Sequence, residues 1–355
     1  MKEFYYTAVY NQPYKPCFFK ISRTNRFYAI IAAINIGALL MTIAFVYPGQ
    51  GSQVVGMAKD LYDNFSVAKD VLDRVCATLK QDLKTLMFDG PTDELTLTEN
   101  TQPALLAASM MAQKVLEEKL EKPINQLATA VAGHSLGEYS ALTAAGCFSI
   151  ENAASLVRLR GNAMQKAVPI GQGSMAAIIG LETSLIEELL QKMPNTNWIA
   201  QIANDNSPGQ IVVSGHTDAI GWVIEQAKEK GAKRALSLPV SAPFHSSLME
   251  PAANTMEKAL ASVNINQPCL DVYANVTARV IEHPAEIAPL LVEQITGRVR
   301  WTELISNMNR KGINTFVEIG TGKVLSGLIK RIAPEANVYN FGNKDELDAI
   351  TKLWM

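Results

Sequence analysis

The stretch AVAGHSLGEYSAL, residues 130–142, joins an apolar strand to a helix through the pentapeptide Gly-His-Ser-Leu-Gly, residues 133–137. A serine between two glycines at a strand-to-helix turn matches the nucleophile elbow, whose sharp turn pushes the hydroxyl out at the edge of a sheet. The helix that follows points its N-terminus at Ser135, so the Leu136 N–H is a candidate donor to an oxyanion. The alternatives are a chance pentapeptide and a serine that only caps the helix.

Strand-like and helix-like segments alternate on both sides of this stretch. Apolar runs at 42–47, 128–133 and 314–320 predict strands, and residues 101–120 and 323–332 have helical periodicity. Such alternation is typical of an α/β fold with a largely parallel sheet. Together with the elbow, it predicts an α/β-hydrolase-like parallel-sheet domain.

Residues 171–239 predict a unit of their own. The segments follow the order strand, helix, strand, strand, helix, strand, which is the ferredoxin-like pattern. Pro169 before this unit and Pro239 after it suit the entry and exit of the chain. We therefore expect a small ferredoxin-like domain at 171–239, inserted into a large domain formed by residues 42–170 and 240–355.

Residues 1–41 differ in composition from the rest. They carry five basic residues against one acidic residue, and residues 27–41 contain no charge. The segment can be a signal-peptide core, a membrane anchor if it continues to Tyr47, or an extension upstream of a true start at Met41. We favour the last, because the stretch after Met41 reads better as the first strand of the large domain.

The overall composition argues against two classes of function. The net charge is −2 and no run of basic residues occurs, so there is no electrostatic case for nucleic acid binding. The four cysteines are scattered, which argues against a disulfide framework and a zinc site. We expect buried free thiols in a reducing compartment and no metal; the cysteines are Cys17, Cys76, Cys147 and Cys269.

A nucleophilic serine needs a base, and the chain contains four histidines. His134 is adjacent to Ser135 and leaves the elbow in another direction, whereas His216 and His283 read as solvated loop residues. His245 follows a strand and precedes a helix, which suits a loop at the sheet edge, so it is the favoured base. The acidic residues between Ser135 and His245 fall mostly on helices of the inserted unit. A dyad, with the histidine oriented by a backbone carbonyl, therefore fits better than a triad.

Two glycine turns and two arginines are further candidate binding groups. The turn at 48–51 fits neither a P-loop nor a dinucleotide fingerprint, but a backbone N–H near Gln50 can be a second oxyanion donor; a plain turn is the alternative. The turn at 320–322 either binds an anion or is only a tight turn without a ligand. Arg158 and Arg160, on the helix after the elbow, are equal candidates to pair with a substrate carboxylate, or are solvated.

Six segments in order resemble the malonyl-CoA:acyl carrier protein transacylase family, and the resemblance covers Thr42 to the last helix. The segments are FVYPGQGSQVVGM (45–57), GHSLGEYSAL (133–142), RLRGNAMQ (158–165), NDNSPGQIVVSG (204–215), KRALSLPVSAPFHSSLM (233–249) and FVEIGTGKVLSGLIKRI (316–332).

The resemblance implies roles for individual residues. Ser135 would be acylated, His245 would be its general base, and the backbone carbonyl of Gln294 would orient the histidine. The N–H groups of Gln50 and Leu136 would form the oxyanion hole.

On the same resemblance, Arg160 rather than the other arginine would hold the malonyl carboxylate. Met164 would line the pocket beside it, and the bulk of Phe244 would leave little room for an α-methyl branch.

The resemblance also implies the reaction and the partners. A malonyl group would pass from malonyl-CoA, through a malonyl-serine, to the phosphopantetheine thiol of an acyl carrier protein for fatty acid elongation. We expect a cytoplasmic enzyme without metal or redox cofactor and without stable membrane association of residues 42–355. The alternatives are a serine thioesterase or esterase, a free-standing polyketide acyltransferase, and a silent carrier-binding module. A basic patch near the pocket mouth is expected for an acidic carrier, with candidates Lys233, Arg234, Lys323, Lys330 and Arg331.

Overall fold

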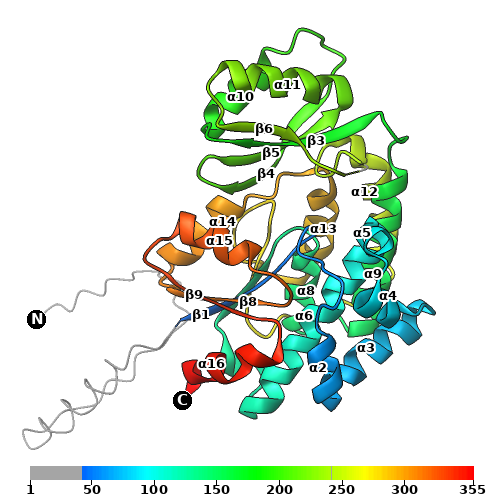
Figure 1. Ribbon diagram of the computed structural model, residues 1–355, viewed down its shortest axis with the longest axis vertical. Helices are drawn as coiled ribbons and strands as arrows, with labels where there is room; N and C mark the ends of the chain where they lie inside the picture. Colours follow the sequence, from blue (N-terminus) through cyan, green and yellow to red (C-terminus); the bar gives the residue numbers. More distant parts are fainter. Residues whose placement is uncertain (1–41, 241) are drawn as a thin grey trace, which may run out of the picture. The chain divides into compact units, whose positions relative to one another are not determined.

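Two β-sheets organise the computed structural model, which describes residues 42–240 and 242–355. One sheet has five strands and the other has four (Figure 1). The predictions about residues 1–41, including Cys17, lie outside the described residues.

The five-stranded sheet has the order β7-β2-β1-β8-β9, and each neighbouring pair is parallel. Its strands are β1 (Ile43–Tyr47), β2 (Ala130–Gly133), β7 (Asp271–Tyr273), β8 (Thr315–Ile319) and β9 (Asn337–Phe341). The strands are short, apolar and linked through helices, as a parallel sheet covered on both faces requires. The α/β fold with a parallel sheet is confirmed.

The central strand β1 is buried along its whole length, and its side chains alternate between two cores. Phe45 and Tyr47 belong to the core shared with α2–α9, α12, α13 and α16. Ala44 and Val46 belong to the core shared with α14 and α15. A strand buried on both faces has no polar alternation, which explains why TIAFVY reads as a continuous apolar run.

A layer of helices packs on the first face. They are α2 (Lys59–Asn64), α3 (Ser66–Leu79), α4 (Leu83–Asp89), α5 (Thr92–Thr96), α6 (Thr98–Leu120), α7 (Ile124–Leu127), α8 (Gly137–Ala144), α9 (Ile150–Lys166), α12 (Glu250–Leu260), α13 (Ile287–Thr296) and α16 (Leu347–Thr351). The second face is covered by α14 (Trp301–Arg310) and α15 (Val324–Ile332). No helix in residues 42–240 or 242–355 combines the length and apolarity needed to cross a bilayer.

The four-stranded sheet has the order β4-β5-β3-β6 and is antiparallel. The elements of this unit follow in the order β3 (Gly173–Ile179), α10 (Thr183–Gln191), β4 (Ala200–Ser207), β5 (Gln210–His216), α11 (Thr217–Glu229) and β6 (Arg234–Ser237). The helices α10 and α11 cover one face and form a core of their own with the strands (Figure 1). Element order and strand order are those of a ferredoxin-like unit, as predicted; the domain bounds at 171 and 239 stay a prediction.

Backbone hydrogen bonds join the smaller sheet to the segment before α14. The Asp205 N–H donates to the Val299 carbonyl at 3.0 Å, and the Val299 N–H donates to the Ala203 carbonyl at 2.8 Å. The Thr302 hydroxyl adds a bond of 2.6 Å to the Asp205 carboxylate. These contacts hold β4 beside the carboxyl ends of the parallel strands.

The two edge strands β7 and β9 were not predicted. β7 has only three residues, and β9 has just one fully buried residue, Phe341. An edge strand pairs on one side only and needs less apolar surface, so its pattern is weaker than that of a central strand.

Candidate active site

Ser135 lies in the turn between β2 and α8, with a φ of +52°. This left-handed conformation is uncommon for a residue that carries a Cβ. A Cβ on Gly133 would lie 1.9 Å from the Gly137 carbonyl, and a Cβ on Gly137 would lie 2.1 Å from the Tyr47 carbonyl oxygen. The flanking glycines therefore allow α8 to approach β1 and β2 at backbone contact, and the turn has the form expected of a nucleophile elbow.

The predicted base lies beside the serine. Ser135 Oγ is 2.7 Å from His245 Nε2, and His245 Nδ1 is 2.8 Å from the Gln294 carbonyl oxygen. A carbonyl oxygen only accepts, so Nδ1 carries the proton and Nε2 presents its lone pair to the serine hydroxyl. This order is the one that proton transfer from Ser135 to His245 requires.

Burial keeps this histidine neutral. His245 is only 4% exposed. Its burial and then the nearby Arg160 charge lower its pKa to about 3, against the hydrogen bond to Gln294, which raises it. At neutral pH the imidazole is therefore unprotonated and able to accept a proton.

The other three histidines have partners elsewhere. His134 Nε2 is 2.7 Å from the Asn206 side-chain oxygen, so the residue next to the nucleophile contacts β4. His216 Nδ1 accepts from the Ile199 N–H at 3.0 Å, and His283 begins a short 3-10 helix. None of these three contacts Ser135 through its ring in the described part of the chain.

Arg160 comes from α9 and lines the same cavity as the serine. It is 1% exposed, and its Nη2 donates to Ser135 Oγ at 3.1 Å and to Gln294 Oε1 at 2.8 Å. Its Nη1 donates to Gln102 Oε1 at 2.9 Å. Burial lowers the pKa of this guanidinium, although the nearby Tyr139 and Glu138 groups act in the opposite direction. Such a buried cation suits a carboxylate ligand.

The second candidate arginine is separate from the site. Arg158 donates to the Asn100 side-chain oxygen at 2.8 Å and to the Gln81 side-chain oxygen. Two residues along a helix turn the side chain by about 200°, so only one of this pair can face the serine.

A cavity of about 130 Å³ opens over Ser135 and collects the remaining predicted residues. Gln50, Leu136, Met164 and Phe244 all line it together with Ser135, His245 and Arg160. The smaller sheet and the segment after it also contribute side chains, which are Met175, Asn204, Leu238 and Val240. The site is therefore built from both sheets.

Three residues that hold the catalytic groups in place were missed in the sequence. Gln102 holds Arg160, whereas Asn275 and Glu138 hold the elbow. Asn275 Oδ1 accepts from the Ser135 N–H at 2.7 Å, across 140 positions of sequence. No local pattern marks an asparagine or glutamine for such a role, because the partner is supplied by tertiary contact. Glu138 follows the pentapeptide directly, so its position in the elbow helix was the one available signal.

Glu138 is a buried carboxylate at 1% exposure. Its Oε2 accepts from Gln294 Nε2 at 2.6 Å and from the Asn275 N–H at 3.1 Å, and its Oε1 has no partner among the described residues. Burial raises the pKa of this carboxyl to about 7, although both hydrogen bonds and the Arg160 charge lower it.

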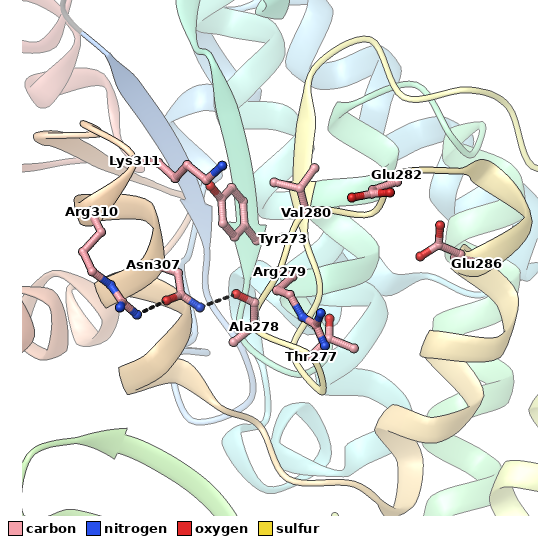
Figure 2. A pocket seen from close by; sticks show the side chains of 10 residues that line it. All are labelled: Tyr273, Thr277, Ala278, Arg279, Val280, Glu282, Glu286, Asn307, Arg310 and Lys311. Carbon is pink, nitrogen blue, oxygen red and sulfur yellow. Dashed lines mark hydrogen bonds between the residues drawn. The ribbon is translucent and has the colours of Figure 1, made fainter. Parts of the chain in front are cut away.

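A larger cavity, of about 700 Å³, lies beyond β7, away from the serine. Figure 2 shows its rim, with Arg310 turned toward Asn307 and with Glu282 and Glu286 on the far side. It contains none of the predicted catalytic or substrate-binding residues of the described chain. The small cavity is the candidate active site because it holds a serine and a histidine in hydrogen-bond contact.

The described residues contain no cluster of metal-ligating side chains and no disulfide. Within the described ranges, no three His, Cys, Asp or Glu side chains are grouped to hold a metal ion. Cys76, Cys147 and Cys269 are free, and Cys147 is buried as expected. The expectation of a buried thiol is wrong for Cys269, which is exposed in the loop before β7.

Comparisons with known proteins agree on one family. The acyl transferase domain model matches residues 44–337. A malonyl CoA-acyl carrier protein transacylase of Bacillus subtilis is 47% identical over 82% of this chain and 90% of its own length. The enzyme of that name from Escherichia coli K12 is 42% identical over 81% of this chain and 92% of its own length.

Solved structures are similar over nearly their whole length. An acyl-carrier-protein S-malonyltransferase from Bartonella henselae aligns with a TM-score of 0.86 at 49% identity, covering 88% of this chain and 99% of that one. A malonyl-transacylase solved in complex with a type II polyketide synthase acyl-carrier protein aligns with a TM-score of 0.84 at 40% identity, covering 88% and 99%.

Proposed function

This chain belongs to the family of acyl transferase domains, and we propose that it transfers a malonyl group from malonyl-CoA to the phosphopantetheine thiol of an acyl carrier protein, supplying fatty acid elongation. The proposal is supported by the names of relatives that are 41–47% identical. The observation that carries it is the position of Ser135 Oγ, which lies 2.7 Å from a histidine base and 3.1 Å from a buried arginine.

The first half of the reaction acylates the serine. Ser135 Oγ attacks the thioester carbonyl carbon while His245 Nε2 takes the hydroxyl proton. The tetrahedral intermediate then collapses, the carbon–sulfur bond breaks, and the CoA sulfur receives the proton from the imidazolium. The Gln294 carbonyl holds the imidazole through both transfers, in the role that a carboxylate has in a triad.

The second half runs the same steps in reverse. The carrier thiol gives its proton to His245 and attacks the malonyl ester, and Ser135 leaves with that proton. The two substrates contribute every atom that is transferred, so we propose that the enzyme needs no metal and no redox cofactor.

The charge of the intermediate requires donors at the carbonyl oxygen. We assign this role to the N–H groups of Gln50 and Leu136, which both line the cavity with Ser135. A single donor of this kind is worth about 10²–10³ in rate where it has been removed from a protease.

Malonyl is distinguished from acetyl by its carboxylate. We assign that carboxylate to the Arg160 guanidinium, whose two terminal nitrogens face Gln102, Gln294 and the serine. Two parallel N–H donors match the two oxygens of a carboxylate. Met164 and Phe244 border the same small cavity, so their bulk disfavours a branched acyl group.

The carrier protein is expected to dock at basic residues along the smaller sheet. Ile179, the last residue of β3, pairs with Arg234 on one neighbouring strand and with Gln210 on the other. The Gln210 side-chain oxygen accepts a hydrogen bond from Arg331. Both arginines therefore lie at one end of this sheet. The other end of β3 supplies Met175 to the cavity. Met175 and Ile179 are four residue steps apart along β3, roughly 13 Å.

Not all five candidates for the patch are equally available. Lys323 forms an ion pair of 3.3 Å with Glu346, whereas Lys233, Arg234, Lys330 and Arg331 form none among the described residues. The four unpaired cations are exposed and are the better candidates to meet an acidic partner.

Intact-mass measurement tests the proposal. The protein is mixed with malonyl-CoA, then with holo-acyl carrier protein, with acetyl-CoA and Ser135→Ala as controls. We expect one malonyl adduct, absent from Ser135→Ala, that moves to the carrier. Free malonate without a stable adduct would favour a thioesterase, and neither adduct nor malonate would favour a silent binding module.

The same assay separates two pathways. A polyketide role is the second candidate, because one similar structure was solved with a polyketide synthase carrier protein. Parallel transfer reactions with a fatty acid carrier and a polyketide carrier decide between them.

We also propose a cytoplasmic location, which cell fractionation tests.

A further inference from the structure

The buried carboxylate of Glu138 does not take part in the reaction steps above, yet it lies one helical turn from the nucleophile. Its Oε2 accepts two hydrogen bonds, from Gln294 Nε2 at 2.6 Å and from the Asn275 N–H at 3.1 Å. These donors come from α13 and from the segment after β7, which are 156 and 137 positions from Glu138. One oxygen therefore ties three segments of the chain together.

Both donors in turn hold the peptide groups of Ser135. The Ser135 N–H donates to Asn275 Oδ1 at 2.7 Å, and the Ser135 carbonyl accepts from Gln294 Nε2 at 2.9 Å. Asn275 Nδ2 also donates to the Gly133 carbonyl at 2.7 Å. The strained residue is thus held at both ends by the side chains of two residues that Glu138 also binds, Gln294 through its side chain and Asn275 through its backbone N–H.

Glu138 and Arg160, the two neighbours of the Gln294 side chain, decide which way its amide faces. Toward Glu138 lies a carboxyl acceptor, so the amide NH₂ must point there; toward Arg160 lies a guanidinium, so Oε1 must point there. The reversed amide would place oxygen against oxygen and NH₂ against guanidinium. The same residue presents its backbone carbonyl to His245 Nδ1 at 2.8 Å.

We infer that Glu138 is a positioning residue for the malonyl transfer: through Gln294 and Asn275 it holds the serine elbow, the carbonyl that orients His245, and Arg160 in one geometry. This inference rests on the proposed function, since the geometry matters only if Ser135 is acylated. It assigns no contact between Glu138 and substrate.

Single-turnover malonylation of Ser135, followed by quenched intact mass, tests the inference. Glu138→Leu removes the acceptor at similar size, and we expect at least a tenfold fall in the malonylation rate constant at saturating malonyl-CoA. Glu138→Gln can keep an oxygen at the Oε2 position, so it is expected to restore most of that rate. Ser140→Ala is the matched control, because this buried hydroxyl on the same helix has no partner among the described residues.

A double variant separates positioning from simple stability. Gln294→Met removes the amide but leaves the backbone carbonyl for His245. If Glu138 acts through this amide, the loss in Glu138→Leu/Gln294→Met is smaller than the product of the two single losses. Multiplicative losses, or a leucine variant as fast as wild type, overturn the inference.

Two other results have a defined meaning: a Glu138→Leu variant that does not fold, and a wild-type protein that is not malonylated. If Glu138→Leu does not fold, Gln294→Met alone decides, with a tenfold loss expected and an unchanged rate against the inference. If wild-type protein is not malonylated, the proposed function fails first, and that result is visible before any variant is made.

Discussion

Ser135 has a backbone conformation that costs energy and is held by its neighbours. A non-glycine residue at a φ of +52° stores on the order of 1–3 kcal/mol. Two hydrogen bonds offset this cost: the Ser135 N–H donates to Asn275, and the Ser135 carbonyl accepts from Gln294. In return, the hydroxyl stands clear of the helix and meets His245 and Arg160 at the same oxygen.

Substitution of Arg160 tests the carboxylate site. Arg160→Ala should lower kcat/KM for malonyl-CoA by about 10- to 150-fold, since a charge-assisted pair is worth roughly 1.5–3 kcal/mol. Acetyl-CoA, which has no carboxylate, should lose far less or gain. Arg158→Ala is the control and should keep the malonyl preference, because Arg158 contacts Asn100 and Gln81 instead of the serine. Unchanged malonyl kinetics in Arg160→Ala would remove this residue from the site.

The pH profile tests the state of the base. With its pKa lowered to about 3 by burial and by Arg160, His245 is neutral throughout the range from pH 5 to 8. The kcat/KM for malonyl-CoA should therefore show no limb from this histidine near 6.5, its usual pKa. The profile is best recorded in Glu138→Gln, because the carboxyl with a pKa of about 7 is absent there. A limb near 6.5 in that variant would contradict a desolvated base.

At the scale of elements, the unit β2–turn–α8 depends on backbone contact with β1. The Gly137 Cα lies so close to the Tyr47 and Pro48 carbonyls that an added Cβ would be 2.1 Å and 2.9 Å from their oxygens. Both neighbours are main chain, so neither can rotate away. The glycine is needed for this approach, independent of its φ.

A pair of Gly→Ala variants measures this contact. Gly137→Ala should lower the free energy of unfolding by several kcal/mol, about 3 or more, and abolish malonylation, because α8 must move away from β1. Gly221→Ala lies in the exposed face of α11 with open space at its Cβ, so it should stabilise by about 0.5–1 kcal/mol. Urea titration gives both values. Equal effects of the two variants would show that helix propensity, and not the contact, decides.

The start of α15 bears on whether the turn at 320–322 binds an anion. The Glu318 carboxylate accepts from the Leu325 and Ser326 N–H groups at 3.1 Å and 2.7 Å. The start of α15 therefore already holds an anion, which the chain itself supplies from β8. The N–H groups of Leu325 and Ser326 are therefore not free to bind an outside anion.

At the scale of the whole molecule, the active cavity depends on the contact of two sheets. Met175, Asn204 and Leu238 come from the smaller sheet or its edge, whereas Ser135 and Arg160 come from the larger one and its helices. The backbone bonds between Ala203, Asp205 and Val299 hold this arrangement. These bonds join the smaller sheet, which carries basic residues at one end, to the segment before α14.

Charge reversal tests the docking surface at this scale. Lys233→Glu/Arg234→Glu should slow transfer from malonyl-Ser135 to the carrier protein and leave formation of the adduct from malonyl-CoA much less affected. The wild-type rate should fall with added salt, and the variant should lose this dependence, since exposed charges are screened within about 10 Å at 0.1 M. The change at Lys323→Glu is the control, because Lys323 is engaged by Glu346. Salt-independent transfer in the wild type would remove charge from the docking argument.

Local signals sufficed for the elements and for the nucleophile. The apolar run of β1, the order of strands and helices in 171–239, and the glycine-flanked Ser135 are patterns of neighbouring residues, and steric rules act over such short distances. Elimination among four histidines pointed to His245 from its place in the chain. The short edge strands β7 and β9 escaped, because a strand paired on one side needs little apolar sequence.

The choice between Arg158 and Arg160 shows where this local information ends. By spacing alone the two were equal, and only the resemblance to a family favoured Arg160. The packing of α9 against α6 and the elbow turns one guanidinium to Ser135 and the other to Asn100. A sequence does not state which face of a helix a distant element will cover.

The sequence by itself determined the α/β fold, the elbow and the acyl transferase family, because each is carried by contiguous motifs. Only the tertiary structure decided that Glu138, Asn275 and Gln294 meet beside the serine, across up to 156 positions. The physical reason is burial: most polar groups removed from water are hydrogen-bonded, and the fold, not the neighbouring residues, determines which partner lies within hydrogen-bond distance.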